Sequence, residues 1–243
     1  MKQKQIQTNF QRVETKYILD RATLARLEAE MHAYLIPDDY ATSTISNVYF
    51  DNDDFQMIQD SIARRGGREK LRMRTYAAEP TKDSQVFLEI KKKSEDVGFK
   101  YRLVSNLTSV VNYIEKELAD QTISDERVKT EVELLQERYA GLKPKMVISY
   151  DRYSMKGSED KKVRVTVDSN IRFRDYDVDL TSGRHGYPLL EDDMVIMEIK
   201  VPGEYPEWMS AILNKYGLED QSFSKYGKAY LKSKELVPQA VKV

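Results

Sequence analysis

Charged and apolar residues alternate along the chain between residues 69 and 105. The side chains of a strand point alternately to its two faces, so a period of two sorts residues by face. In the first segment, Arg72 and Arg74 would share one face. Leu71 and Met73 would lie on the other. The pattern therefore predicts a strand with one cationic and one apolar face.

The same alternation returns in the next two segments of this stretch. It places Glu89 and Lys91 on one face of a second strand, and Lys100 and Arg102 on one face of a third. Polar turns containing proline and glycine separate the segments, which suits an antiparallel meander. Because like charges on neighbouring strands repel each other, we expect the shared cationic face to hold an anion.

Alternating runs elsewhere predict further strands, and runs with helical spacing predict helices between them. Asp20 is a good N-cap residue for a helix whose apolar positions continue to Leu35. Thr108 or Ser109 is expected to cap another helix. The remaining strands are predicted over residues 12–19, 44–50, 146–153, 162–168, 170–174 and 194–201.

The apolar surfaces of these strands and helices need partners. If the helices cover the apolar strand faces, the charged faces point inward, as in a barrel with a polar lumen. Inward lysine and arginine side chains are costly unless carboxylates or a bound anion balance them, and a linear polyphosphate chain would do so. No linker rich in glycine, serine or proline divides the chain. We therefore expect a single domain over residues 10–236 and a disordered tail over 237–243.

Composition narrows the range of chemistry. The 243 residues include 39 Lys+Arg and 40 Asp+Glu, so the cationic strands are a local concentration and nucleic acid is not an expected partner. Cysteine is absent and only two histidines are present, which argues against disulfides, Cys-ligated zinc and a Ser-His-Asp triad. No apolar stretch is long enough to span a bilayer, so a cytoplasmic location is expected.

A Glu-x-Lys pattern recurs in three predicted strands, at residues 14–16, 89–91 and 198–200. Residues two apart on a strand share a face at a spacing of about 6.5–7 Å. This spacing suits a divalent cation beside a phosphate oxygen, because carboxylates bind hard cations and lysine binds phosphate. Charge neutralisation on a sheet explains any single pair better, so the hypothesis depends on the repetition.

Nine short segments follow one another in the order ETKYIL, YFD, LRMRTY, FLEIKKK, KYR, SYDRY, VRVTVD, MEIKV and FSKYGKAYL. In this order they resemble the polyphosphate polymerase domain of the vacuolar transporter chaperone (VTC) family, within the triphosphate tunnel metalloenzyme superfamily. The resemblance runs from about Phe10 to about Leu236. It implies an α+β fold, an antiparallel eight-stranded β-barrel tunnel with a polar basic lumen and helices packed outside.

The resemblance also implies an activity and the residues that perform it. The family's enzymes are phosphotransferases that move the γ-phosphate of ATP onto a growing polyphosphate chain, with Mn²⁺ or Mg²⁺. The implied catalytic residues are Arg72, Arg74, Lys91 and Glu198, and Glu198 is also the implied metal ligand. The implied binding residues for ATP, polyphosphate or tripolyphosphate are Lys16, Lys100, Arg102, Arg152, Arg164, Lys200, Lys225 and Lys228.

Two departures from the family pattern leave the reaction open. Arg12 stands where the hydrolytic branch of the superfamily has the first glutamate of Glu-x-Glu-x-Lys, which argues against a simple triphosphatase or adenylate cyclase. The chain shows no counterpart of the phosphate-sensing and membrane domains of the eukaryotic assemblies, so translocation would need a separate membrane partner. The alternatives to a polymerase are a tripolyphosphatase or nucleoside triphosphatase in the same tunnel, and a non-catalytic module that binds polyphosphate or nucleotide.

Overall fold

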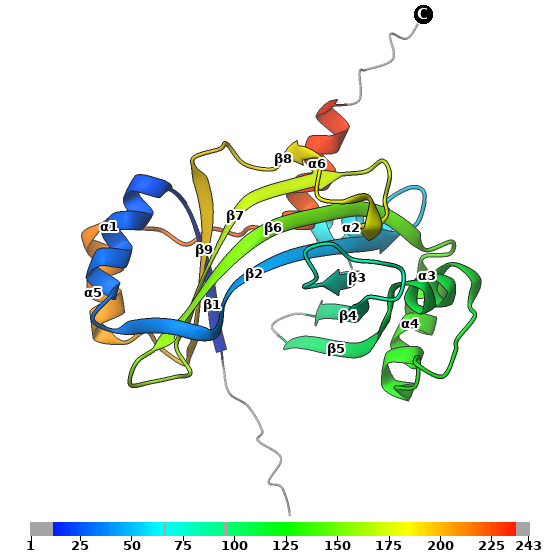
Figure 1. The fold of residues 1–243 in the computed structure, drawn as a ribbon, viewed down its shortest axis with the longest axis horizontal. Helices are drawn as coiled ribbons and strands as arrows, with labels where there is room; N and C mark the ends of the chain where they lie inside the picture. Colours follow the sequence, from blue (N-terminus) through cyan, green and yellow to red (C-terminus); the bar gives the residue numbers. More distant parts are fainter. Residues whose placement is uncertain (1–11, 66, 95–96, 237–243) are drawn as a thin grey trace, which may run out of the picture. The chain divides into compact units, whose positions relative to one another are not determined.

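The computed structural model describes residues 12–65, 67–94 and 97–236 (Figure 1). The described part contains nine strands, six α-helices and one turn of 3₁₀-helix. The strands are β1 (Arg12–Asp20), β2 (Leu35–Asp51), β3 (Arg68–Thr75), β4 (Gln85–Ser94), β5 (Val97–Asn106), β6 (Lys143–Gly157), β7 (Arg164–Arg174), β8 (Tyr187–Pro188) and β9 (Met194–Pro202). The helices are α1 (Arg21–Met31), α2 (Gln56–Ala63), α3 (Leu107–Lys116), α4 (Glu126–Arg138), α5 (Glu207–Lys215) and α6 (Lys225–Leu236), with the 3₁₀ turn η1 at Leu180–Ser182.

The strands form one sheet in the order β1-β9-β7-β6-β2-β3-β4-β5, with β8 paired to β7 beside this path. The pairs β1–β9, β7–β9, β2–β3, β3–β4 and β4–β5 are all antiparallel. This confirms the expected α+β fold built on an antiparallel sheet. Eight strands lie along the path, and the two-residue β8 is an addition to the expected set.

The chain divides into two compact units. The first comprises Met1–Ser43, Asp151–Ser169 and Leu190–Phe223, and the second comprises Thr44–Tyr150, Asn170–Leu189 and Ser224–Val243. The single domain expected over residues 10–236 stays a prediction. The tail expected to be disordered, 237–243, lies outside the described residues.

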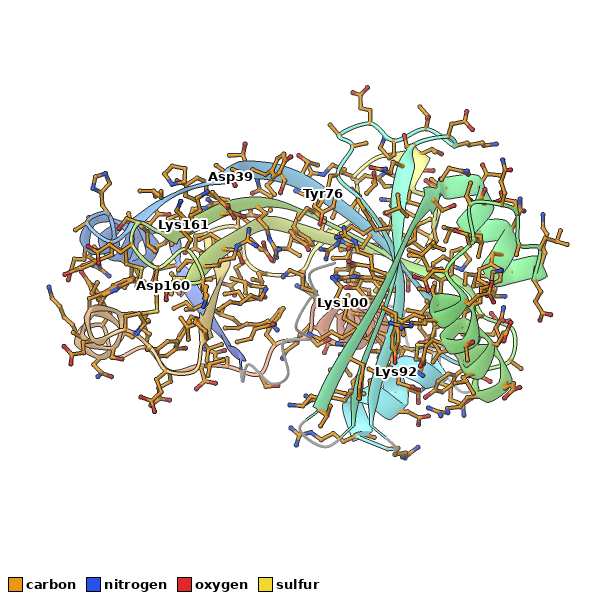
Figure 2. The ribbon with its side chains drawn as sticks, turned by 90° about the horizontal axis from the view of Figure 1, so that it is seen from below. Asp39, Tyr76, Lys92, Lys100, Asp160 and Lys161 are labelled. Atoms are coloured by element: carbon orange, nitrogen blue, oxygen red, sulfur yellow. The ribbon has the colours of Figure 1, made fainter. Side chains whose placement is uncertain are left out.

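In the second unit, helices α3 and α4 cover one face of β3, β4 and β5 (Figure 1). Leu71, Leu88 and Leu103 belong to the buried apolar cluster on that face, together with residues of both helices. Lys92 also lies on the helix side, where it pairs with Glu131 of α4. Lys100 lies on the side of the sheet away from these helices (Figure 2). The alternation predicted from the sequence is therefore confirmed for this meander.

The first unit follows the same plan with different helices. Tyr17 of β1, Val165 of β7 and Met197 of β9 belong to one buried apolar cluster, to which α1 contributes Leu27 and α5 contributes Met209. Alternate residues of these strands occupy the opposite, charged face. Burial of the apolar faces under helices thus fixes which side chains each charged face displays.

Several element boundaries differ from the sequence prediction. Asp20 caps α1 as expected, since its Oδ1 accepts a hydrogen bond from Thr23 N at 2.7 Å. The helix ends at Met31, however, and Leu35 begins β2. Tertiary burial of Leu35 in the sheet core therefore overrides its helical spacing. One strand, β7, replaces the two predicted over 162–168 and 170–174.

The cap of α3 is also different from the prediction. Asn106 is the N-cap, and its side chain accepts a hydrogen bond from Ser109 N at 2.9 Å. Ser109 is buried one turn later and donates its hydroxyl to Asp120. The predicted caps, Thr108 and Ser109, lie within the first turn because asparagine at the preceding strand end competes successfully for the capping position.

Candidate functional site

The charged face of β3, β4 and β5 has a regular arrangement, which we call the Glu89 face. The strand register aligns Lys70, Lys91 and Lys100 in one row across the three strands. The next row aligns Arg72, Glu89 and Arg102. Directly opposed residues of neighbouring strands lie on the same side of a sheet, so these two rows form one surface. Arg74 shares it, two residues beyond Arg72 on β3.

Glu89 is the centre of this surface and is 2% exposed. Its Oε2 accepts hydrogen bonds from Arg72 Nε at 2.9 Å and Nη2 at 2.7 Å. Its Oε1 lies 2.7 Å from Lys100 Nζ and 3.4 Å from Arg102 Nε. Arg74 Nε lies 3.9 Å from Oε2. One buried carboxylate therefore faces four cations, and the surface keeps an excess of positive charge.

This arrangement determines the ionisation of Glu89. Burial by itself would raise the pKa of its carboxyl, but the charges of Arg72 and Arg74 and the hydrogen bond from Lys100 lower the pKa to about 2. Burial would likewise lower the pKa of Arg72, yet the neighbouring Tyr49 and Glu89 raise it above its usual value. Both groups stay charged at neutral pH.

A layer of tyrosines supports the arginines. Tyr49 Oη accepts a hydrogen bond from Arg72 Nη1 at 3.3 Å, and the Tyr49 ring stacks on Tyr226 of α6 with centroids 4.5 Å apart. Tyr226 in turn donates its hydroxyl to the buried Asp51 at 3.0 Å. Burial raises the pKa of Asp51, although Asp51 also accepts from backbone N–H groups at the start of α2. The base of α6 is thereby fixed next to Arg72.

Two lysines reach the same region near the start of α6. Lys225 Nζ lies 4.8 Å from the centre of the Tyr150 ring, and the Tyr150 hydroxyl accepts a hydrogen bond from Arg74 Nη2 at 3.1 Å. Lys70 Nζ donates to Ser224 Oγ at 2.7 Å. Lys228, one turn further along α6, is exposed. Within the second unit, the structure thus brings Lys225 to the arginines and leaves Lys228 at the surface.

The first unit carries a second charged surface, on β1, β9 and β7, which we call the Glu198 face. One row of the register aligns Lys16, Glu198 and Thr166, and the neighbouring row aligns Glu14, Lys200 and Arg164. Glu198 is 7% exposed, so it too is a buried carboxylate among cations.

The contacts of Glu198 and its neighbours are ionic. Lys200, two residues along β9, pairs with the Glu198 carboxylate. Lys16 Nζ lies 3.6 Å from Glu14 Oε1 and donates a hydrogen bond to the backbone oxygen of Phe223 at 3.2 Å. The two Glu-x-Lys pairs of this face therefore lie side by side on neighbouring strands, an adjacency that the sequence did not predict.

The predicted arginines of the first unit have carboxylate partners that the sequence did not reveal. Arg152 binds Asp168 through two parallel hydrogen bonds of 2.6 and 2.7 Å, and Asp168 is buried. Arg164, which is half exposed, pairs with Asp38 of β2. Bidentate pairing holds a guanidinium plane in a fixed direction, so Asp168 orients Arg152.

Few carboxylates in the described part of this chain lie where they could hold a divalent cation. Among the described residues, no group of three or more histidine, aspartate or glutamate side chains lies close enough to bind a metal. Mg²⁺ and similar ions often take only one or two carboxylates and complete their shell with water and substrate phosphates. Glu198, with Glu14 in the adjacent row, fits this second type of site.

One important residue and several partners were not predicted from the sequence. Alternation predicted the cations of the Glu89 face, but not that Glu89 is the carboxylate on which they converge. The signal was present, because Glu89 is the acidic residue of FLEIKKK and alternation places it on the cationic face. Asp168 and Tyr150, by contrast, carry no such local signal, since only the pairing of distant strands brings them to Arg152 and Arg74.

Comparisons with known proteins give a related sequence and a related fold. The Schizosaccharomyces pombe protein "Vacuolar transporter chaperone complex subunit 4" is 25% identical over 269 residues, which cover 90% of this chain. The match covers 37% of the length of that protein. A crystal structure from Bacillus halodurans, of a candidate adenylate cyclase, superposes with a TM-score of 0.54 over 87% of this chain and 92% of its own, at 16% identity. At that identity the likeness shows the fold alone.

The VTC domain family matches residues 11–234, which is most of the chain. Both charged faces and the strands that carry them lie within the matched segment. The chain therefore belongs to the VTC domain family.

Proposed function

We propose that this chain is an ATP-dependent polyphosphate polymerase, which transfers the γ-phosphate of ATP to the end of a growing polyphosphate chain. The observation that carries the proposal is the convergence of Arg72, Arg74, Lys100 and Arg102 on the single buried carboxylate of Glu89. A face with this excess of positive charge favours a ligand with closely spaced negative charges. Guanidinium groups match the geometry of phosphate oxygens particularly well.

The proposed reaction is a single phosphoryl transfer. A terminal oxygen of the polyphosphate chain attacks the γ-phosphorus of ATP, the bond from that phosphorus to the β–γ bridging oxygen breaks, and ADP leaves. Arg72 and Arg74 would stabilise the charge on the transferring group, and Lys91 and Lys100 would bind neighbouring phosphates. Catalysis of this kind depends mostly on position and electrostatics, so it needs no histidine or cysteine nucleophile.

The other cations would act in substrate binding. In the first unit these are Lys16, Lys200, Arg152 and Arg164, and in the second they are Arg102 and Lys225. The exposed Lys228, a binding residue by family resemblance, would contribute little. We assign the divalent cation, Mn²⁺ or Mg²⁺, to Glu198, with Glu14 as its neighbour. When bound, the cation would neutralise charge on the phosphates. In the absence of ligand, the Glu198 carboxylate pairs with Lys200.

The remaining part of the proposed function concerns the partner and the location of this chain. The S. pombe relative is named as a subunit of a complex, and we propose that this chain also works with a separate membrane partner. None of the described helices combines the length and hydropathy needed to span a bilayer. We also propose that this chain acts on the cytoplasmic side of that partner.

The test is to incubate the purified chain with ATP and Mn²⁺ and to separate the products by gel electrophoresis. A polymerase gives a ladder of long polyphosphate with release of ADP. Orthophosphate as the only phosphate product would instead identify a triphosphatase, and tight binding of tripolyphosphate without turnover would identify a binding module. Arg72→Ala should abolish the ladder, whereas Arg65→Ala, at a largely exposed arginine of the same unit, should leave it intact.

A further inference from the structure

Thr166 of β7 has a buried hydroxyl that none of the described residues uses. The residue is 8% exposed, and its Oγ1 has no hydrogen-bond partner among the residues that the structure describes. A buried hydroxyl that has given up water without gaining a protein partner lowers stability. Valine has nearly the same shape as threonine and suits a strand equally well, so it could fill this position without that cost.

The hydroxyl lies on the charged face of its strand. Thr166 is directly opposite Glu198 in the register, and Glu198 is directly opposite Lys16. Opposed residues of this kind have their Cβ atoms about 5 Å apart. The flanking residues of β7, Val165 and Val167, point to the other side and join the apolar cluster of this unit. The unused donor therefore lies on the Glu198 face, beside Glu198 and diagonal to Lys200 of the neighbouring strand.

The surroundings indicate what kind of ligand would use this donor. Lys16 and Lys200 supply positive charge on the same face, and Lys200 pairs with the carboxylate of Glu198. A hydroxyl donates one directional hydrogen bond and accepts others, so it can complete the shell of an anionic oxygen that the lysines attract. The three groups together match a phosphate oxygen.

We propose that Thr166 is a binding residue of the Glu198 face, whose hydroxyl donates a hydrogen bond to a phosphate oxygen of the bound polyphosphate chain. This inference rests on the proposed function, because it assigns Thr166 to the substrate of that reaction. The unpaired hydroxyl is a cost to the free protein, and the bound phosphate removes it. Thr166 would therefore lower the stability of the free protein and raise its affinity for polyphosphate.

The experiment compares Thr166→Val and Thr166→Ser with the wild type, using tripolyphosphate as the probe and thermal unfolding and calorimetric titration as readouts. Thr166→Val should raise the melting temperature of the ligand-free protein by about 2–4 °C, because it removes a buried unpaired donor. The same variant should bind tripolyphosphate about tenfold more weakly, as expected for one lost hydrogen bond to a charged group. Thr166→Ser keeps the hydroxyl and should retain most of the affinity.

A matched control lies on the other face of β1. The Thr15 hydroxyl is hydrogen-bonded to Tyr205, and the residue opposes the buried Ile199. Thr15→Val should lower the melting temperature and leave tripolyphosphate affinity unchanged. Wild-type binding that Thr166→Val does not weaken would overturn the inference and leave the proposed function standing. Absence of tripolyphosphate binding by the wild type would overturn both.

Discussion

Replacing Glu89 by glutamine tests whether its carboxylate is the counter-ion of the buried arginines. The substitution keeps size and shape and removes one negative charge. Lowering the pKa of Glu89 from its usual 4.5 to about 2 corresponds to roughly 3 kcal/mol of preference for the ionised form. Lys100 and Arg102 are 53% and 40% exposed, so solvent screens their share. We therefore expect Glu89→Gln to lower the free energy of unfolding by about 2–3 kcal/mol.

The assay is thermal and urea unfolding of both proteins, with and without tripolyphosphate. For a chain of this length the expected loss lowers the melting temperature by about 5–10 °C. Tripolyphosphate should then stabilise the variant more than the wild type, because the anion meets one more uncompensated positive charge and binds only the folded state. The two melting temperatures should move closer together as ligand is added.

Glu126→Gln provides the control, since it removes a carboxylate of the same unit that is 82% exposed and pairs with Lys129 within α4. Its effect should stay below about 1 kcal/mol. If Glu89→Gln had the same melting temperature as the wild type, the Glu89 carboxylate would not be balancing buried positive charge. If tripolyphosphate left the gap between the two proteins unchanged, the Glu89 face would not be where the anion binds.

Three further predictions concern pH, the metal ligand and α6. The pKa of Glu89 is depressed in the folded state, so the contribution of its carboxylate to stability is complete above about pH 4.5 and is lost as the pH falls toward 2. The difference in unfolding free energy between wild type and Glu89→Gln should therefore narrow over that range. A constant difference would show that the Glu89 carboxylate is not the counter-ion of the buried arginines. Glu198→Gln should abolish Mn²⁺-dependent product formation, while tripolyphosphate affinity stays equal or increases because a repelling charge has gone. Undiminished phosphoryl transfer by this variant at limiting Mn²⁺ would show that Glu198 takes no part in the reaction. Lys225→Ala should weaken tripolyphosphate binding several-fold, whereas Lys228→Ala, at an exposed position of the same helix, should change it little. Equal losses of affinity in titration calorimetry would show that both lysines reach the ligand.

The sequence by itself determined the two-faced strands of this protein. Alternation of Arg72 and Arg74 with Leu71 and Met73 is a local property, and burial of the apolar set under helices leaves the cations only one side on which to lie. The cap at Asp20 was also readable, because an N-cap bonds to an N–H three residues away and needs no tertiary partner.

Only the tertiary structure decided how the charges are paired. Glu89 meets Arg72 and Arg102 because the register between β3, β4 and β5 sets those residues in one row. The register depends on turns and on packing of the whole sheet, and a slip of one residue would exchange the faces without any change in composition. The environment of Thr166 was likewise decided by the tertiary structure. The sequence VRVTVD does not show whether the threonine hydroxyl has a partner, because the register of the neighbouring strands sets Glu198 and Lys16 in its row.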